Sequence, residues 1–424
     1  MYIIGILKWK WEEIMIENFE QTKKILKYQK QEQILEYPIR NKEEFASEVL
    51  KINFEELNKL YDKAIKNEKV ENSKIEPIPY IEKDKLSEEE KEHYKKIGEN
   101  IIRNNEYAVV TMAGGQGSRL GHDGPKGTFD FGLENHKSIF EVLCDRLKEA
   151  YKKYNVYIPW YIMTSRQNNE DTINFFKKNN YFGYSKENVY FFKQGELPVL
   201  NDQGKLMLNK EGNINTAADG HGGVFISMEK EKITENMKQR GIKWVFIGPV
   251  DNVLIKMIDP IFIGICQDKN VLAGGKSIIK AYPEERVGVF CKKDGKPDVI
   301  EYTEISKEMA EMKNDRGELV YAESHINCNV FNIDIIEKIS KNKLPYHSAH
   351  KKIEYLNKEG QVVKPEEPNA YKFEAFIFDA FKMLDEMTIF RVKREEEFAP
   401  IKNAEGKDSP KTALELYKNF YSNR

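Results

Sequence analysis

The feature that most constrains this chain is an apolar run that ends at a cluster of glycines. The run YAVVTM, residues 107–112, is apolar throughout, as in a strand that is covered on both faces of a parallel sheet. The loop that follows, AGGQGSRLGHDGPKG, opens with a cluster of three glycines, Gly114, Gly115 and Gly117, and carries two cations, Arg119 and Lys126. Because open α/β sheets bind ligands at the carboxyl ends of their strands, this loop is the first candidate for a binding site.

The composition of the loop favours an anion as its ligand. Glycines let backbone N–H groups approach an anion without interference from Cβ atoms, and successive N–H groups can form an anion nest. Arg119 and Lys126 can follow the charge of a phosphate group through a reaction. A tight turn with two solvated cations is the alternative. A dinucleotide-dependent oxidoreductase is disfavoured because Gly121 comes one residue late for G-x-G-x-x-G, and a P-loop is disfavoured because GxxxxGK[ST] is absent.

From residue 106 the chain alternates between apolar strand patterns and helical patterns. Residues 139–154 place apolar side chains on one helical face, and IPWYIMTS, NVYFFKQ and KWVFIGPVDN have the character of buried strands. This alternation predicts an α/β fold with a largely parallel mixed sheet flanked by helices. We expect an N-terminal helical region over 1–100, a central α/β domain over 101–395 and a short C-terminal segment over 396–424.

Several local boundaries can also be predicted. Ser87 and Glu90 form a capping-box pattern at the start of a helix, and Ser409–Pro410 is a suitable start for the last helix. Asp294–Gly295 predicts the turn of a β-hairpin. The stretch KIEPIPYIEKDKL, residues 74–86, is interpreted as a proline-containing connector.

Composition and charge exclude several classes of protein. The formal net charge is −2, which lacks the electrostatic signature of a general nucleic-acid binder. No apolar run approaches the roughly 18–20 residues of a membrane helix, and the initial MYIIGILKWKW is too short for a signal peptide. Met15 is an alternative start to Met1. The four cysteines are scattered, which suggests buried, reduced thiols. We therefore expect a cytoplasmic protein without nucleic-acid or membrane partners.

Eight further motifs follow the glycine loop: FFKQGELPVL, ADGHGGVF, GPVDNVLIKMIDP, VIEYTEIS, INCNVFNID, LPYHSAHKKI, VKPEEPNAYKFEAFIFDAF and EEEFAPIKNAEGKDSP. Their content and order resemble the eukaryotic-type UDP-sugar pyrophosphorylases, and above all the UDP-N-acetylhexosamine pyrophosphorylases. The likeness covers roughly residues 90–415. It implies a Rossmann-like nucleotide-diphospho-sugar transferase fold and a uridylyltransferase that joins UTP to a sugar 1-phosphate and releases pyrophosphate.

The same resemblance implies roles for residues around the nucleotide. The backbone of Gly114, Gly115 and Gly117 would hold the nucleotide, with Gln194 reading the uracil edge and Gly220 lying against the base. Arg119, Lys126 and Lys402 would be the catalytic cations on the phosphates. Asp251 would hold a Mg²⁺ ion, a hard cation that suits a carboxylate and retains several waters.

For the sugar phosphate, the family pattern points to His221, Glu301, Tyr302, Asn329 and Lys372. His221 departs from the acetylhexosamine pattern DGNGG and is more similar to UDP-glucose and broad-range UDP-sugar pyrophosphorylases. N-acetylglucosamine 1-phosphate is the favoured substrate, and glucose 1-phosphate remains the alternative. His347 and His350 could suggest a metal pair, but the family stretch that they resemble has no metal role.

Two further expectations follow from the comparison of patterns. Longer family members carry an additional C-terminal β-rich domain, which in some serves self-association. Little of the chain follows Lys402, so we expect a minimal enzyme that is a monomer. A catalytically silent sugar-nucleotide sensor is the alternative of another class, and the retention of cations for a departing pyrophosphate argues against it.

Overall fold

The computed structural model describes residues 18–66 and 73–422, which form two compact units. Unit 1 combines the described residues up to 66 with Glu196–Gly220 and Pro345–Phe376. Unit 2 contains the described parts of Asn72–Gly195, His221–Leu344 and Ile377–Arg424. The choice between Met1 and Met15 and the apolar stretch at the start both lie outside the described residues.

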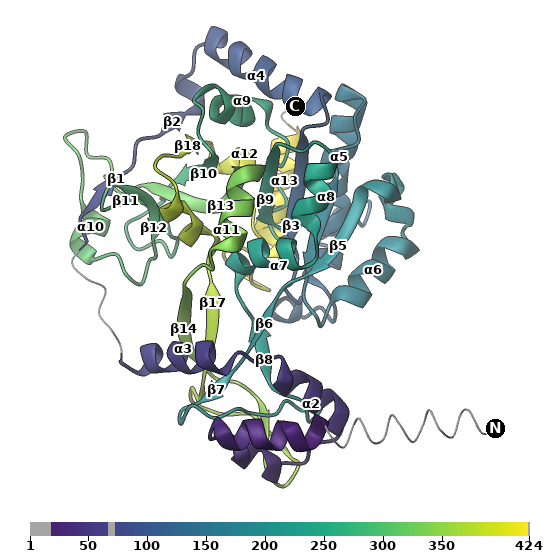
Figure 1. Cartoon of the computed structure of the whole chain (residues 1–424). Coiled ribbons are helices and arrows are strands. Elements are labelled where there is room, and N and C mark those ends of the chain that lie inside the picture. The colour runs from purple at the N-terminus through teal and green to yellow at the C-terminus, as the bar shows by residue number, and fades with distance from the viewer. Residues whose placement is uncertain (1–17, 67–72, 423–424) are drawn as a thin grey trace. The chain divides into compact units, whose positions relative to one another are not determined.

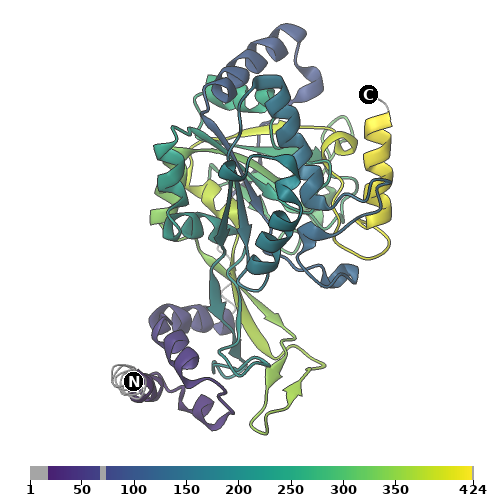
Figure 2. The ribbon, with the colours of Figure 1, turned by 90° about the vertical axis from the view of Figure 1, so that its right-hand side faces the viewer.

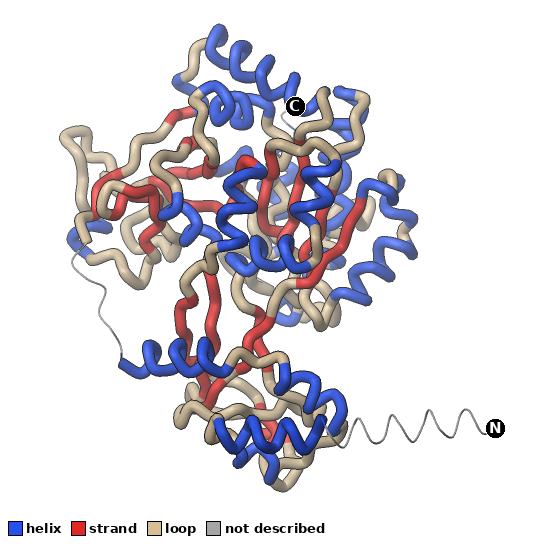
Figure 3. The backbone as a smooth tube through the Cα atoms, in the orientation of Figure 1, coloured by secondary structure: helices blue, strands red, loops and turns tan. Residues whose placement is uncertain are grey.

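Unit 2 is built on a mixed sheet (Figures 1 and 3). Its main strands are, in spatial order, β2 (Ile81–Glu82), β18 (Thr388–Arg391), β10 (Ala273–Ile279), β13 (Glu323–Asn332), β9 (Trp244–Pro249), β3 (Tyr107–Met112), β4 (Trp160–Thr164) and β5 (Val189–Lys193). Neighbours in this series are parallel except that β13 runs antiparallel to both β10 and β9. The predicted α/β fold with a largely parallel mixed sheet is confirmed.

Helices cover both faces of this sheet. Helices α7, α8 and α11 pack together on one face, and α5 and α13 lie on the other side (Figures 1 and 2). The α-helices of unit 2 are α4 (Glu88–Arg103), α5 (Ile139–Tyr154), α6 (Asn169–Lys178), α7 (Val224–Lys230), α8 (Ile233–Gln239), α9 (Pro260–Asp268), α10 (Lys307–Glu311), α11 (Ile333–Lys341), α12 (Arg394–Glu397) and α13 (Pro410–Ser422). The apolar faces of α4, α5, α6, α9 and α13 and the sheet enclose a large core, which includes Ile139, Leu143, Leu147 and Ala150, the predicted face of α5.

Local sequence signals correctly placed several boundaries. Ser87 and Glu90 form the predicted capping box of α4, because each side chain accepts from the other residue's backbone N–H. Asp294–Gly295 joins β11 (Val289–Lys293) to β12 (Lys296–Ile300) as the predicted hairpin, with both residues at positive φ. Helix α13 begins at Pro410, as expected.

The predicted connector over residues 74–86 contains more structure than its prolines suggest. Its first part is β1 (Ile75–Pro77), which pairs antiparallel with β11, and its second part is β2, at the edge of the main sheet beside β18. Both strands have two or three residues, and a proline is tolerated where it donates no ladder hydrogen bond. Such short pairings depend on partners more than 200 residues away, so periodicity within the segment could not indicate them.

Unit 1 has a core of its own, made from three separate stretches of chain. Helix 18–28 and its neighbours pack their apolar side chains with residues from the later stretches, such as Leu206 and Phe373. The named elements of the unit are η1 (Glu32–Glu36), α2 (Lys42–Leu50), α3 (Phe54–Lys66), β6 (Glu196–Pro198), β7 (Leu200–Asn201), β8 (Thr216–Ala218), β14 (Tyr346–Lys351), β15 (Tyr355–Leu356), β16 (Val362–Val363) and β17 (Ala370–Ala375). The expected N-terminal helices are present.

Two sequence-based exclusions can be compared with the fold. Cys144, Cys266, Cys291 and Cys328 are all buried and unbridged, as predicted, and burial raises the pKa of each thiol. Within residues 18–66 and 73–422, every helix is too short or too polar to cross a bilayer.

Helices α4 and α9 approach each other through two glycines. A Cβ atom on Gly98 of α4 would lie 1.9 Å from the carbonyl oxygen of Pro260, the first residue of α9. A Cβ atom on Gly264 of α9 would lie equally close, 1.9 Å, to the carbonyl oxygen of Tyr94 in α4. Because both obstacles are backbone atoms, neither can be relieved by a change of rotamer.

Replacement of Gly98 by alanine is therefore expected to destabilise the protein, although alanine is the better helix former by about 1 kcal/mol. Overpacking against backbone should lower the free energy of unfolding by about 1–3 kcal/mol. Urea unfolding of Gly98→Ala and of Asn100→Ala, an exposed control in the same helix, measures the effect. A gain in stability in Gly98→Ala would contradict the close approach of the two helices.

Candidate active site

The strand directions in unit 2 bring several loops to one edge of the sheet. Strands β3, β4, β5 and β9 are parallel, and β10 and β18 point the same way because both neighbours of β13 are antiparallel to it. The loops that follow these strands carry the glycine cluster, Gln194, Asp251 and Lys402. Residues predicted from four separate motifs therefore share the carboxyl edge of one sheet, where such sheets bind ligands.

The glycine loop is closed by backbone hydrogen bonds. The N–H of Gly117 donates to the carbonyl of Gly124 at 2.9 Å, and the N–H of Lys126 donates to Gly115 at 3.0 Å. Lys126 thereby returns to the base of the loop at the start of η4 (Lys126–Thr128). Gly115 faces open space, because a Cβ atom there would have no neighbour within 4 Å. The closed loop with an open, glycine-lined side suits the predicted anion cradle.

Gly114 and Gln194 are brought into direct contact. A Cβ atom on Gly114 would lie 2.6 Å from Gln194 Oε1, so a larger residue would displace the amide that we expect to read uracil. Gln194 is itself fixed by its backbone, whose N–H donates to the carbonyl of Thr164 at 2.8 Å. The cradle and the predicted base-reading residue thus adjoin.

Asn168 is a residue of this site that the sequence analysis missed. It is fully buried, and its Nδ2 donates to the carbonyls of Ala113 and Gly115 at 3.0 and 3.3 Å. Its Oδ1 accepts from the N–H of Ser165 at 2.8 Å, which fixes the orientation of the amide. Asn168 therefore holds the carbonyls of the glycine loop away from the N–H groups that would face an anion. An isolated asparagine in a loop carries no sequence signal for this role.

Lys126 and Asp251, which the sequence analysis assigned to different tasks, form an ion pair. Lys126 Nζ lies 3.1 Å from Asp251 Oδ2, and both side chains are mostly buried. Lys126 comes from the glycine loop and Asp251 from the end of β9, so the pair joins two neighbouring loops of the same edge. A cation and a carboxylate at the same point can hold phosphate oxygens and a metal ion together.

The segment that carries Lys402 is connected to the Asp251 loop by backbone hydrogen bonds. The N–H of Ile401 donates to the carbonyl of Asp251 at 2.8 Å. Asn252 completes the connection, because its Nδ2 donates to the carbonyl of Glu397 at 2.7 Å and its Oδ1 accepts from the N–H of Ala399 at 2.9 Å. The segment that carries Lys402 is thus attached to the loop that carries Asp251. Asn252 is a second positioning residue that the sequence analysis did not single out.

Arg119 lies on the outer side of the loop, in η3 (Ser118–Leu120), where its side chain is exposed. Among the described residues it has no hydrogen-bond or ion-pair partner. The guanidinium is therefore not committed to a structural role, and its assignment to the phosphates stays a prediction.

The fit of a Mg²⁺ ion depends on Asp251. Within the described part of the chain, no group of three or more His, Cys, Asp or Glu side chains could hold a metal ion. One carboxylate at the end of β9 fits the way in which Mg²⁺ is usually held beside phosphates, with substrate oxygens and waters completing its six ligands. Asp251 thus suits an ion that arrives with a nucleotide, and not a resident metal cage.

Three of the five residues predicted to contact the sugar phosphate, His221, Glu301 and Asn329, lie near a buried histidine. This histidine, His325, was not named in the sequence analysis. His325 Nε2 lies 3.1 Å from Asn329 Oδ1, and its backbone N–H donates to Gly288 at 2.9 Å. Burial lowers the pKa of His325 to about 3, so the ring is neutral at physiological pH. Since Asn329 Oδ1 can only accept, Nε2 must carry the proton, and His325 fixes the orientation of the Asn329 amide.

His221 and Glu301 approach the same cluster. The ring of Phe378 lies 6.2 Å from that of His221 and 6.3 Å from that of His325. His221 Nδ1 accepts the N–H of Ile377 at 3.1 Å, so a neutral His221 has its proton on Nε2.

Glu301 and Tyr302 follow β12 but differ in their surroundings. A Cβ atom on Gly288 would lie 3.1 Å from Glu301 Oε1, so Glu301 adjoins the residue that His325 contacts. The Tyr302 side chain is 45% exposed, and no described residue hydrogen-bonds to its hydroxyl. The structure brings His221, Glu301 and Asn329 together and leaves Tyr302 at the surface.

Gly220 and Lys372 belong to unit 1 and are described within it. Gly220 has φ +85°, and a Cβ atom on it would lie 2.3 Å from the carbonyl oxygen of Ala375, so only glycine fits. Lys372, in β17, pairs with Glu374 at 2.8 Å. Both predicted roles stay predictions.

The histidines of β14, His347 and His350, lie on opposite faces of their strand, because they are an odd number of positions apart. His350 Nε2 binds Asp202 Oδ1 at 2.7 Å, and its ring stacks on Tyr371. His347 stacks on Phe376. Each ring is thus held by partners of its own within unit 1.

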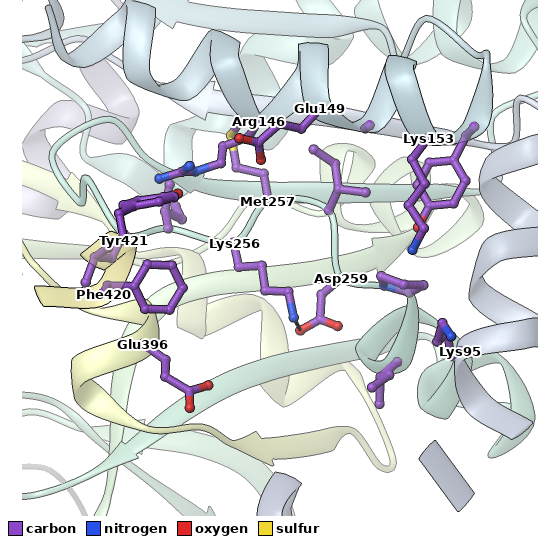
Figure 4. A pocket seen from close by; sticks show the side chains of 17 residues that line it. Lys95, Arg146, Glu149, Lys153, Lys256, Met257, Asp259, Glu396, Phe420 and Tyr421 are labelled. Carbon is purple, nitrogen blue, oxygen red and sulfur yellow. Dashed lines mark ion pairs between the residues drawn. The ribbon is translucent and has the colours of Figure 1, made fainter. Parts of the chain in front are cut away.

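A cavity of about 340 Å³ lies elsewhere in unit 2, between α5, residues 254–261 and the end of α13 (Figure 4). Lys256 and Asp259 form an ion pair inside it, at 3.4 Å. No predicted site residue lines this cavity, so it is separate from the candidate site. Asp259 also binds the buried Lys276 Nζ at 2.8 Å, and Lys276 in turn binds Glu397, at the base of the segment that carries Lys402.

Comparison with known proteins relates this geometry to a family. The family profile described as UTP--glucose-1-phosphate uridylyltransferase matches residues 52–422. The chain belongs to this family. The match of the uridylyltransferase family covers every residue that was predicted for the site, from Gly114 to Lys402.

Individual members of the uridylyltransferase family agree with this assignment. The chain is 36% identical over 407 residues to a probable UDP-N-acetylglucosamine pyrophosphorylase of Dictyostelium discoideum, covering 89% of this chain and 83% of that one. It is 39% identical over 360 residues to the UDP-N-acetylglucosamine pyrophosphorylase of Saccharomyces cerevisiae, covering 82% and 75%. The solved Trypanosoma brucei uridine diphosphate N-acetylglucosamine pyrophosphorylase superposes with a TM-score of 0.80 at 28% identity, covering 94% and 84%. The expected nucleotidyltransferase fold is confirmed.

The buried His325 generates a prediction about acid stability. The pKa of this histidine is about 3 in the folded chain and about 6.5 when unfolded, so the unfolded state binds its proton first as the pH falls. When the pH is lowered from 7.5 to 5.5, protonation of this histidine in the unfolded state should lower the unfolding free energy of the wild type by about 1.4 kcal/mol. His325→Gln, which keeps a donor for Asn329 but does not titrate, should lose about 1.4 kcal/mol less over the same interval.

Urea unfolding at the two pH values tests this prediction. His136→Asn is the matched control, because the His136 side chain is 84% exposed, its surface contact with Asp130 contributes little to stability, and asparagine tolerates its φ of +53°. The control should lose as much stability as the wild type. Equal losses in wild type and His325→Gln would contradict a neutral His325 in the folded state.

Proposed function

We propose that this protein is a Mg²⁺-dependent uridylyltransferase that joins UTP and a sugar 1-phosphate to give a UDP-sugar and pyrophosphate. The observation that carries the proposal is the ion pair of Lys126 with Asp251, attached to the Lys402 segment beside an open, glycine-lined loop. Membership of the uridylyltransferase family and the activities for which the relatives are named support it.

The reaction requires positioning and charge compensation. An oxygen of the sugar phosphate attacks the α-phosphorus of UTP, a new P–O bond forms, and the bond to the β-phosphate breaks with release of pyrophosphate. The sugar phosphate is already an anion, so no general base is needed to generate the nucleophile. The barrier lies in bringing two anions together and in the charge that gathers on the departing group.

The site residues divide this work. The N–H groups of the glycine loop hold the nucleotide phosphates, and Gln194, beside Gly114, matches the uracil edge because an amide both donates and accepts. Lys126, Arg119 and Lys402 compensate the charge on the phosphates. Bound to Asp251, Mg²⁺ would supply further positive charge to phosphate oxygens.

N-acetylglucosamine 1-phosphate is the sugar phosphate that we favour, because the named relatives in Dictyostelium and Saccharomyces are UDP-N-acetylglucosamine pyrophosphorylases. His221, Glu301 and Asn329 would contact the sugar. His221 favours glucose 1-phosphate as the second candidate, since the UDP-glucose type of sequence carries histidine at this position.

Pyrophosphate release from UTP and Mg²⁺ with a panel of sugar 1-phosphates tests the proposal. We expect kcat/KM for N-acetylglucosamine 1-phosphate to exceed that for glucose 1-phosphate by about tenfold or more. The reverse preference would identify glucose 1-phosphate as the preferred substrate. If UDP-sugars bind but no sugar 1-phosphate supports release, the protein is a sugar-nucleotide sensor and the proposal fails.

Lys126→Ala should lower kcat about 10²–10³-fold while UTP affinity changes much less, because the charge matters most when pyrophosphate departs. Steady-state kinetics and UTP titration separate the two effects. Lys152→Ala, which removes an exposed lysine of α5, is the control and should match the wild type. Equal losses in turnover and affinity would mean that Lys126 only helps binding.

A further inference from the structure

Lys402 lies in a segment, residues 394–408, that is attached to other parts of unit 2 at two places. One attachment is made by Asn252, and the other, made by Glu285, has no role assigned so far. Asn252 binds the backbone of the inner part, at Glu397 and Ala399. Beyond Lys402 the chain makes a turn in which the N–H groups of Lys402 and Asn403 both donate to the carbonyl of Asp408, at 2.7 and 3.1 Å. Among the described residues, no carboxylate pairs with Lys402 Nζ, so its position depends on the backbone that carries it.

The second attachment is made by the carboxylate of Glu285. This residue lies in the loop between β10 and β11, and its side chain is only 1% exposed. Arg394 Nη2 donates to its two oxygens at 2.8 and 3.0 Å, and Lys407 Nζ donates to Oε1 at 3.0 Å. The N–H of Ala281 donates to Oε2 at 2.7 Å. One buried carboxylate therefore binds two cations and its own loop.

Arg394 and Lys407 lie on either side of Lys402 in the chain. Arg394 begins α12, which leads into the Lys402 segment, and Lys407 lies in the turn after it. Asn403 Nδ2 also donates to the carbonyl of Lys407 at 2.8 Å, so Lys402 and Lys407 are ends of one hydrogen-bonded turn. A shift of Lys407 must therefore shift the backbone of Lys402.

The charge state of Glu285 suits the binding of Arg394 and Lys407. Burial alone would raise the pKa of its carboxyl, but the Ala281 N–H, Lys407 and Arg394 outweigh burial and lower the pKa. Glu285 is thus ionised at physiological pH. Its partners are more accessible, with Arg394 30% and Lys407 55% exposed at the side chain, so they can turn to solvent when the carboxylate is lost. Removal of this charge should loosen the segment without unfolding the unit.

We propose that Glu285 is a positioning residue for catalysis, which holds the Lys402 segment by binding Arg394 and Lys407 on either side of it. Glu285 itself does not touch the substrates and acts through Lys402. This inference rests on the proposed function of Lys402 at the phosphates. Its structural part, the restraint of residues 401–408, can be measured without any activity.

The kinetic test compares Glu285→Gln with Glu284→Gln, an exposed neighbour that loses the same charge. Glu285→Gln should lower kcat about 10–100-fold, because a displaced catalytic group costs that much, while Glu284→Gln stays within about twofold of the wild type. In a Lys402→Ala background, Glu285→Gln should have almost no further effect, since the group that it positions is gone. An equal loss in both backgrounds, or a loss no larger than that of Glu284→Gln, overturns the proposal.

Hydrogen exchange separates this proposal from the proposed function. In full-length Glu285→Gln, the amides of Lys402 and Asn403, which donate to Asp408, should exchange at least about tenfold faster than in wild type and in Glu284→Gln. Helix α5, remote from the loop, should keep its exchange rates if the unit stays folded. Unchanged exchange over residues 401–408 overturns the positioning role, whether or not the protein proves to be a uridylyltransferase. If exchange rises but the wild type releases no pyrophosphate, the proposed function fails and the catalytic part of the inference fails with it.

Discussion

The candidate site depends on a lysine that is buried in the middle of the sheet. Lys276, in β10, is fully buried, and its ammonium group is bound by Asp259 from the start of α9 and by Glu397 from the end of α12. Burial alone would lower the pKa of Lys276, but the two carboxylates outweigh burial and raise the pKa. A buried charge without partners costs several kcal/mol, so the three segments must meet whenever the unit folds. The backbone of Glu397 is in turn bound by Asn252, next to Asp251.

This constraint explains how residues from distant parts of the chain reach one edge of the sheet. Asp251 and Lys126 come from neighbouring parallel strands and are close by topology alone. Lys402 is about 150 residues further along the chain, and it arrives there because Glu397, Ala399 and Ile401 are each bound to the Asp251 loop or to Lys276. The cations proposed for catalysis are thus carried by rigid backbone. Such preorganisation is what a reaction between two anions requires, because no reorganisation energy is then spent at the transition state.

The cluster around His325, which we propose to contact the sugar, follows a different physical principle. Its central residue, His325, is neutral because burial among Phe290, Phe378 and Phe381 disfavours the charged ring. A neutral ring with a defined proton gives the Asn329 amide one orientation. The proposed phosphate side therefore relies on cations, whereas the proposed sugar side combines oriented neutral donors and acceptors with one carboxylate, Glu301. This division suits a substrate that is anionic at one end and uncharged at the other.

Much of this architecture could be predicted from the sequence, for identifiable reasons. The apolar runs at 107–112 and 244–249, the helical face of α5, the capping box at Ser87 and the turn at Asp294–Gly295 are local signals, so each indicated its own element. The glycine loop predicted an anion cradle because its glycines and cations indicate anion binding by their residue types alone, without knowledge of their tertiary contacts. The sequence could not indicate Asn168, Asn252, Glu285 or His325, since an isolated asparagine, glutamate or histidine has no pattern. Nor could it indicate that residues 196–220 and 345–376 join the N-terminal helices in one unit. Those features exist only through contacts between residues far apart in the chain, and such contacts are decided by the tertiary packing that buries charges beside their partners.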